Sequence, residues 1–108
     1  MLHKRNRLAK RKDIETAFAK GRTFFNPFFR IKFLPEAGQK RFTIVVSTKV
    51  FKKAVARNRL KRILREHIRK NLTGFKNGNY LIMASTKVSN LEEKNVLPNF
   101  LNAASKIK

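Results

Sequence analysis

Residues 51–65 read FKKAVARNRLKRILR, and the predicted fold is built outward from this stretch. Its apolar side chains recur at i, i+4, i+7 and i+8, the spacing of the buried face of an amphipathic helix: Ala56, Leu60, Ile63 and Leu64. Ile68 lies at the border of the same stripe. We therefore expect a helix from about Ala54 to Lys70 that packs this stripe against a core.

The other side of this helix is polar and almost entirely cationic. At about 100° per residue, six side chains share one arc of roughly 140° beside the apolar stripe: Arg57, Asn58, Lys61, Arg62, Arg65 and Arg69. A solvated helix face usually mixes charges of both signs, because like charges at i, i+4 repel each other. Arginine also binds phosphate oxygens in a bidentate way. The pattern therefore indicates a surface that binds nucleic acid.

The composition is that of a small basic domain. The chain has 108 residues, with 27 Lys+Arg against 6 Asp+Glu, so its formal net charge is +21. We expect a single domain over residues 1–108, because this length supports one modest core. Ten Phe and a hydrophobic content of 42% argue against a disordered basic tail. Cysteine is absent, which excludes disulfides and thiolate metal sites. Without a long apolar run or a signal-peptide pattern, we expect a cytoplasmic protein with no membrane partner.

The periodicity of the remaining chain predicts the order α-β-β-β-α-β-α. A short helix is expected from about Lys12 to Lys20, ended by Gly21 in the left-handed conformation. A brief strand over Arg22–Asn26 would follow, and then two alternating runs, Phe28–Leu34 and Arg41–Thr48, joined by a turn. These two runs suggest an antiparallel hairpin with one face open to a ligand.

The last third of the chain predicts one strand and one helix. The continuous apolar run Tyr80–Ala84 is typical of a central strand. A final helical segment should break near Leu97, because Pro98 is better tolerated in a first turn than in a helix interior. Its apolar stripe would be Leu97, Phe100, Leu101, Ala104 and Ile107.

Residues 1–11 form a basic N-terminal segment that includes Arg5 and Arg7. One interpretation is a frayed terminus, and the other is an arm that becomes ordered on phosphate. We expect it to be flexible without RNA.

The chain offers no constellation typical of an active site. The acids are few and scattered, and His67 falls in the apolar stripe of the basic helix, where a packed residue is expected rather than a general base. Four separate glycines make no phosphate-binding loop: Gly21, Gly38, Gly74 and Gly78. We therefore expect no catalytic residue, no metal ligand and no bound cofactor in the protein.

Single-stranded RNA is the expected partner. Aromatic residues such as Phe18 and Phe28, near an open sheet face, would stack on unpaired bases. The competing interpretations are a structural ribosomal-RNA binder, a DNA-binding regulator and, least favoured, a stand-alone nuclease. The long cation ladder without a short preceding helix disfavours the DNA-binding regulator.

The stretch Phe51-x-x-Ala54-x-x-Arg57-Asn58-Arg59-Leu60-Lys61-Arg62-x-Leu64-Arg65 resembles the signature of the protein subunit of bacterial ribonuclease P. The opening Lys4-Arg5-Asn6-Arg7-Leu8 and the segment Asp13-Ile14…Phe18…Gly21 fit the same family, so the resemblance covers nearly the whole chain. Its signature around Arg57 disfavours the structural ribosomal-RNA binder.

The resemblance implies a fold and a division of labour. The fold would be an α+β two-layer sandwich, similar to domain 2 of ribosomal protein S5, with a left-handed β-α-β crossover around the basic helix. In this family the catalytic RNA binds Mg²⁺ and removes the 5′ leader of precursor tRNA by hydrolysis. The protein docks on that RNA and holds the leader. The implied partners are thus the ribonuclease P RNA and the precursor-tRNA leader, with no obligate protein partner.

The family's pattern also assigns residues to two sites. Contact with the catalytic RNA is expected from Arg5, Arg7, Lys53, Arg57, Asn58, Arg59, Lys61, Arg62 and Arg65. A cleft between the first helix and the sheet would bind the leader through Ile14, Phe18, Lys32 and Lys49. Ile14 stands where many relatives carry Phe, and Lys32 where some carry an aromatic residue. We expect an apolar wall at Ile14 and a phosphate contact at Lys32 in place of stacking.

Overall fold

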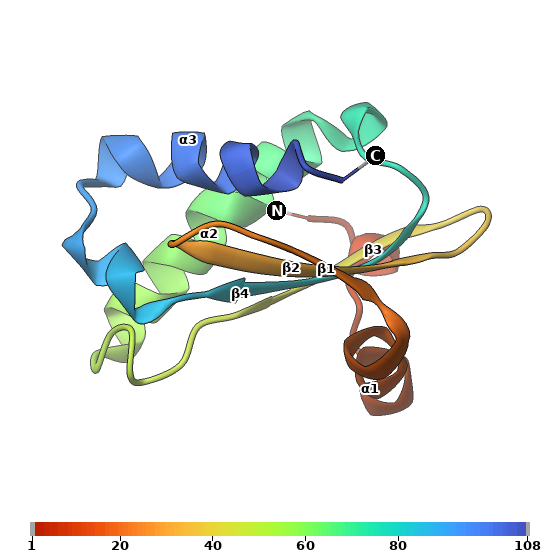
Figure 1. Cartoon of the computed structure of the whole chain (residues 1–108), viewed down its shortest axis with the longest axis horizontal. Helices are drawn as coiled ribbons and strands as arrows, with labels where there is room; N and C mark the ends of the chain where they lie inside the picture. The colour runs from red at the N-terminus through yellow and green to blue at the C-terminus, as the bar shows by residue number, and fades with distance from the viewer. Residues whose placement is uncertain (1, 108) are drawn as a thin grey trace.

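The computed structural model describes residues 2–107, which form an α+β fold of one mixed sheet and three α-helices. Helices α2 (Ala54–Lys70) and α3 (Glu93–Ala104) cover one face of the sheet, and α1 (Arg11–Lys20) crosses the other (Figure 1). The strands are β1 (Arg22–Phe25), β2 (Phe29–Pro35), β3 (Lys40–Val45) and β4 (Gly78–Ala84). Short 3-10 helices precede α1, follow α2 and precede α3: η1 (Lys4–Asn6), η2 (Leu72–Gly74) and η3 (Thr86–Asn90).

The order of the strands corrects one prediction. The sheet runs β1-β2-β4-β3, so β2 and β3 are not a hairpin, and the hairpin is formed by β1 and β2. Strand β4 lies between β2 and β3, antiparallel to β2 and parallel to β3. Alternation identifies which face of a strand is buried, but it carries no information about which strand lies next to it. The apolar run of β4 did identify it as a central strand.

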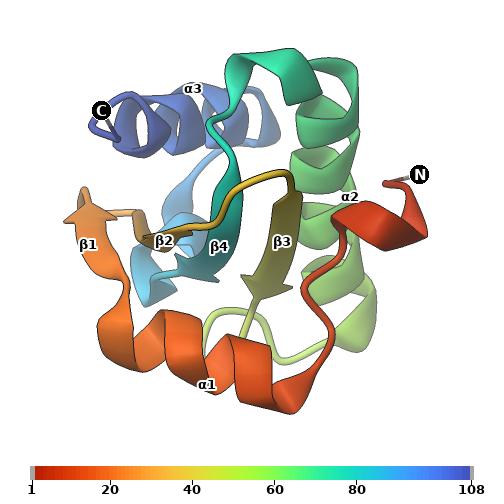
Figure 2. The ribbon, with the colours of Figure 1, turned by 90° about the vertical axis from the view of Figure 1, so that its right-hand side faces the viewer.

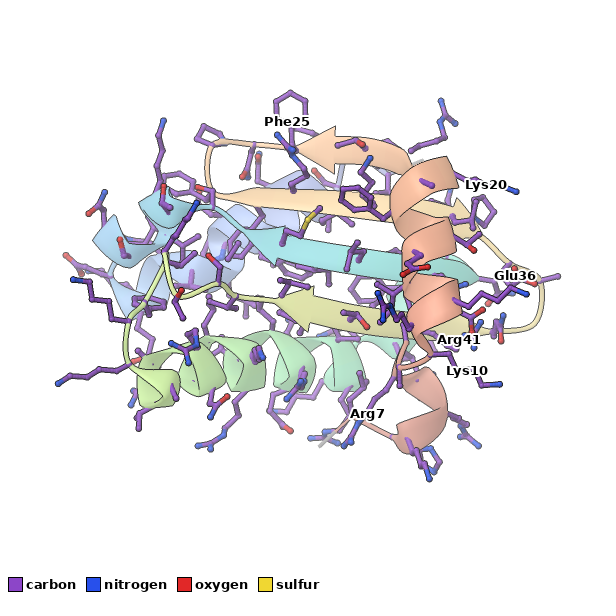
Figure 3. All side chains as sticks on the ribbon, turned by 90° about the horizontal axis from the view of Figure 1, so that it is seen from below. Arg7, Lys10, Lys20, Phe25, Glu36 and Arg41 are labelled. Carbon is purple, nitrogen blue, oxygen red and sulfur yellow. The ribbon has the colours of Figure 1, made fainter. Side chains whose placement is uncertain are left out.

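The predicted left-handed crossover is present. Strands β3 and β4 are parallel neighbours joined through α2. In the view of Figure 3, which looks at the face that α1 crosses, both strands point the same way. Helix α2 packs its buried Leu60, Leu64 and Ile68 against the opposite face. The chain therefore turns in the left-handed sense, whereas nearly all β-α-β units turn to the right.

The core between the sheet and α2–α3 confirms the helical stripe. Leu60, Leu64 and Ile68 are buried on α2 and face an aromatic cluster of the sheet. In that cluster the rings of Phe42 and Tyr80 stack with 4.6 Å between their centroids. The apolar stripe that defines the basic helix therefore anchors it, and its cations are left on the outside.

Helix α3 differs from the prediction in where it begins and in which side chains it buries. It begins at Glu93, five residues before Pro98, which lies inside it. Its buried side chains are Val96, Phe100 and Ala103, whereas Leu101 is 40% exposed. Proline at this position removes one hydrogen bond to a carbonyl of the exposed first turn. The burial of the stripe offsets that cost.

Gly21 also has a different role from the one predicted. Its φ is −68° and ψ is 148°, which is extended backbone rather than the left-handed region. A Cβ here would lie 2.3 Å from the carbonyl oxygen of Ala17. Glycine is required because the chain turns closely against the end of α1 as it enters β1.

Candidate nucleic-acid interface

The exposed side of α2 carries a group of cations that we call the helix surface, defined by Asn58, Lys61, Arg62 and Arg65. Asn58, Arg62 and Arg65 line one shallow hollow together with Glu66. Within residues 2–107, none of Lys61, Arg62 and Arg65 forms an ion pair. Their positive charge is therefore available to an anionic partner.

Other cations predicted for the same site are held by the protein itself. The Nη1 of Arg57 donates to the carbonyl oxygens of Phe51 and Lys52, at 2.9 and 2.8 Å, and so braces the loop before α2. Arg59 forms a bidentate pair with Glu93 of α3, with Nε–Oε1 at 2.9 Å and Nη2–Oε2 at 2.7 Å. These hydrogen bonds raise the pKa of Arg59 and lower the pKa of Glu93. The cations predicted for this site are thus unequal in their freedom to bind an anion.

Arg69 and Lys53 lie at the two ends of α2. Arg69 pairs with Glu66 at 3.0 Å, and its hydrogen bond lowers the pKa of that carboxyl. Lys53 is the N-cap residue and is exposed. Lys53 therefore stays available at the start of the helix surface, whereas Arg69 is partly neutralised at its end.

The N-terminal segment extends the helix surface. Instead of projecting as an arm, residues 2–8 run along the outer edge of β3, beside α2 (Figure 2). The Leu8 N–H donates to the Phe42 carbonyl at 2.9 Å, and the Asn6 side chain donates to the Lys40 carbonyl at 2.8 Å. The Thr43 hydroxyl donates to the Leu8 carbonyl.

The two arginines of that segment face different places. Arg7 lines a hollow together with Arg65, which joins the segment to the helix surface. Arg5 lines another hollow with Gly38 and Asn77, at the turn between β2 and β3. Only Arg7 of the two is therefore continuous with α2.

A second surface lies on the other side of the sheet, where α1 covers only part of it (Figure 3). We call the uncovered part the open sheet face. Its side chains come from α1 and all four strands: Phe18, Phe25, Arg30, Lys32, Val45 and Met83. Phe18 is 55% exposed and Phe25 60% exposed. Large exposed aromatics beside cations are typical of a site for unpaired bases.

Two of the four residues predicted for the leader cleft meet here. The Nζ of Lys32 lies 5.0 Å from the centroid of the Phe18 ring, a cation–π contact. Ile14 is half-buried one turn earlier on α1. Lys49 is exposed in the loop after β3, at the opposite end of the sheet from α1. The ammonium group of Lys32 thus lies over the Phe18 ring and does not project as an isolated cation.

An ionic network that the sequence did not reveal holds α1 on the sheet. Arg41 of β3 pairs with Asp13 of α1 at 3.3 Å, and its Nε donates to Oδ1 of Asn79 at 3.1 Å. Asn79 is only 4% exposed. Because α1 carries Phe18, this network sets where that ring lies over the sheet. The strand alternation places Arg41 on the α1 side, but no sequence signal joined it to Asp13.

Within residues 2–107, no three His, Asp or Glu side chains come close enough together to hold a metal ion. Burial lowers the pKa of His67, whose ring lies 6.5 Å from that of Phe100. Of the helices in the same range, none has the length and apolar character that crossing a membrane requires.

Comparisons with known proteins agree on one family. The model of the Ribonuclease P family matches residues 2–108. The ribonuclease P protein component of Pseudanabaena sp. (strain PCC 6903) is 38% identical over 91 residues, covering 82% of this chain and 78% of that protein. The RNase P protein of Thermotoga maritima has a TM-score of 0.83 at 30% identity, covering 96% of this chain and 99% of the other. The RNase P protein of Staphylococcus aureus has a TM-score of 0.88 over 95% of both chains, but its 21% identity shows the fold alone.

Proposed function

This chain belongs to the ribonuclease P protein family, and we propose that it binds the catalytic RNA through the helix surface and the 5′ leader of precursor tRNA on the open sheet face. In this proposal it assists the endonucleolytic removal of the leader, which produces the mature 5′ end of tRNA. The observation that carries it is the group Lys61, Arg62 and Arg65, which forms no ion pair within residues 2–107 and adjoins Arg7.

The helix surface suits a folded RNA. Its guanidinium groups lie on one rigid helix whose other side is anchored by buried Leu60, Leu64 and Ile68. Because the backbone is already ordered, binding phosphates has to order only the side chains themselves, and the planar guanidinium fork limits that cost. The proposed contacts are therefore strongest at Arg62 and Arg65, with Lys61, Asn58, Lys53 and Arg7 around them.

The open sheet face suits a single strand. Phe18 offers an exposed ring for stacking, and the Lys32 ammonium beside it attracts the phosphate of the same nucleotide. Ile14 supplies an apolar wall on the same helix. Lys49 would attract the strand beyond the far end of the sheet.

The hydrolysis itself is proposed to be carried out by the RNA subunit with its Mg²⁺ ions. This chain would contribute positive charge and an oriented binding site, which raise the local concentration of substrate at the RNA. Such help should matter most when Mg²⁺ is scarce, because protein cations can then replace part of the screening by metal ions.

The experiment that tests this proposal is cleavage of a precursor tRNA with a 5′ extension by a bacterial ribonuclease P RNA at low Mg²⁺. The reaction is run with the RNA alone, with the RNA and this protein, and with the protein alone. We expect strong stimulation by the protein and no cleavage by the protein alone. A folded, RNA-binding protein that gives no stimulation would contradict the proposal and favour a structural ribosomal-RNA binder.

A further inference from the structure

We infer that the open sheet face holds a second stacking site, formed by Phe25 with Arg30 beside it, which binds another nucleotide of the same single strand as Phe18. The inference rests on the proposed function and extends it, because neither residue belongs to the leader cleft that the family's pattern predicts. It would give this chain a longer contact with the leader than Phe18 and Lys32 provide.

The strand register places both residues on the same face as Lys32. Arg30 and Lys32 are two apart on β2, so they project to the same side, about 6 to 7 Å apart along the strand. Phe25 of β1 is the cross-strand partner of Arg30. Phe24, its neighbour in sequence, packs against the core on the opposite face. Phe25 therefore lies one strand outward from Arg30, on the side of α1.

The arrangement repeats the ring and cation of the first site. At Phe18, an exposed ring on α1 is paired with a cation of β2 at 5.0 Å. At Phe25, an exposed ring on β1 lies opposite the next outward-facing cation of β2. Arg30 is exposed and forms no ion pair within residues 2–107. An exposed ring with a neighbouring cation thus occurs twice along β2, as a cation–π contact at Phe18 and as a cross-strand pair at Phe25.

The position of Phe25 is held by contacts of its backbone and its neighbour. The Lys106 ammonium donates to the Phe25 carbonyl at 2.7 Å. The side chain of Asn26 donates to the Asn99 carbonyl at 2.8 Å, and its Oδ1 accepts from the N–H groups of Phe28 and Phe29. Phe25 therefore ends β1 beside a well-braced turn, and Figure 3 shows it at the β1 edge of the sheet. A braced, exposed aromatic is suited to stacking because little order has to be imposed on it.

The space beside the ring is open to a base. Phe25, Arg30 and Met83 line one hollow at this end of the sheet, together with Pro27 and Ser85. Val45, the cross-strand partner of Met83, continues the row and is 43% exposed. The row offers apolar contact for bases and one guanidinium for a phosphate, and no described acid lines the hollow. These features fit a single strand of RNA.

The experiment uses the holoenzyme and precursor tRNAs whose leaders carry the fluorescent base 2-aminopurine at one position at a time. Stacking on an aromatic ring quenches this base. We expect Phe25→Ala to relieve quenching at one leader position and Phe18→Ala to relieve it at another. Phe25→Ala should also lower the affinity for the full leader about tenfold, because stacking on one ring is lost. Phe25→Trp should retain both the quenching and the affinity.

The control is Arg22→Ala. Arg22 is an exposed cation on the same hairpin, but the alternation of β1 directs its side chain to the other face of the sheet. Arg30→Ala should weaken leader binding more than Arg22→Ala does. The inference is overturned if the Phe25→Ala holoenzyme quenches 2-aminopurine as strongly as the wild type at every leader position, while Phe18→Ala still relieves quenching at one position. If no leader position is quenched and Phe18→Ala has no effect, the proposed leader site fails, and this inference fails with it.

Discussion

The cations of α2 differ in what they contact, although their sequence pattern treats them alike. Arg59 is held by Glu93 and Arg57 by two carbonyls, whereas Arg62 has no ion-pair partner in residues 2–107. An arginine that already satisfies a carboxylate must break that pair before it binds phosphate. The sequence predicted the surface, but the partners of its members depend on α3, which folds back from another part of the chain.

At this scale we expect Arg62→Ala to weaken binding to the catalytic RNA more than Arg59→Ala does. Loss of one phosphate contact should also lower the slope of log K against log salt by about one unit. Both quantities come from RNA titrations at several salt concentrations. The two variants are matched because each loses one positive charge. Equal effects of the two substitutions would show that the Glu93 pair does not restrain Arg59.

Arg41 is expected to matter for stability and for the position of α1. Arg41→Met should lower the free energy of unfolding by about 1 to 3 kcal/mol, because it leaves the buried Oδ1 of Asn79 without its donor. Asp13→Asn should cost less, since Asp13 is partly exposed and the Arg41–Asn79 bond remains. Urea denaturation measures both. An unchanged midpoint for Arg41→Met would mean that solvent replaces the lost donor.

His67 should make stability depend on pH in the acid range. Burial lowers its pKa in the folded state below the usual value of 6.5, so the unfolded state binds the proton first as the pH falls. The free energy of unfolding should then decrease below about pH 6.5 and stay level above it as far as this residue is concerned. Urea midpoints at a series of pH values, compared with those of His67→Gln, test the effect. The dependence should be smaller in the variant, and identical curves would rule out His67 as its source.

At the scale of elements, the sequence predicted well which face of a helix or strand is buried, and predicted poorly which elements lie next to each other. The stripe of α2 and the central position of β4 followed from periodicity, because both depend on burial of the element itself. The pairing of β2 with β4 could not be predicted in the same way, since any two strands with one buried face fit the alternation equally well. For the same reason the open sheet face was predicted beside Phe18, but Phe25 and the Arg41 network were missed.

Helix α3 offers a prediction at this scale. Pro98→Ala should raise the free energy of unfolding by about 1 to 2 kcal/mol, because it restores a backbone hydrogen bond inside the helix. The gain is less than the full cost of an interior proline, since alanine also leaves the unfolded chain freer. Thermal unfolding followed by circular dichroism measures it. A lower melting temperature would show that Pro98 itself contributes to the packing of α3.

For the whole molecule, the formal charge of +21 acts on folding and on binding in opposite directions. Salt screens the repulsion between cations and should raise the melting temperature of the free protein. The same salt should weaken RNA binding with a log–log slope of about −4 to −5, if about six phosphates are neutralised. Melting and binding measured over one salt series test both expectations. A slope near zero would contradict a cationic interface.

The place of β4 in the sheet has a consequence for how the protein is made. A ribosome synthesises β1, β2 and β3 first, yet β2 and β3 touch only through β4, which begins at Gly78. More than three quarters of the polypeptide, as far as Ala84, must therefore leave the exit tunnel before the sheet can close. Until then the nascent chain keeps apolar strand faces and a dense run of positive charge unsatisfied, next to ribosomal RNA. Completion of the sheet should thus be a late event in translation, and the arginines of α2 would meet RNA before the fold that displays them exists.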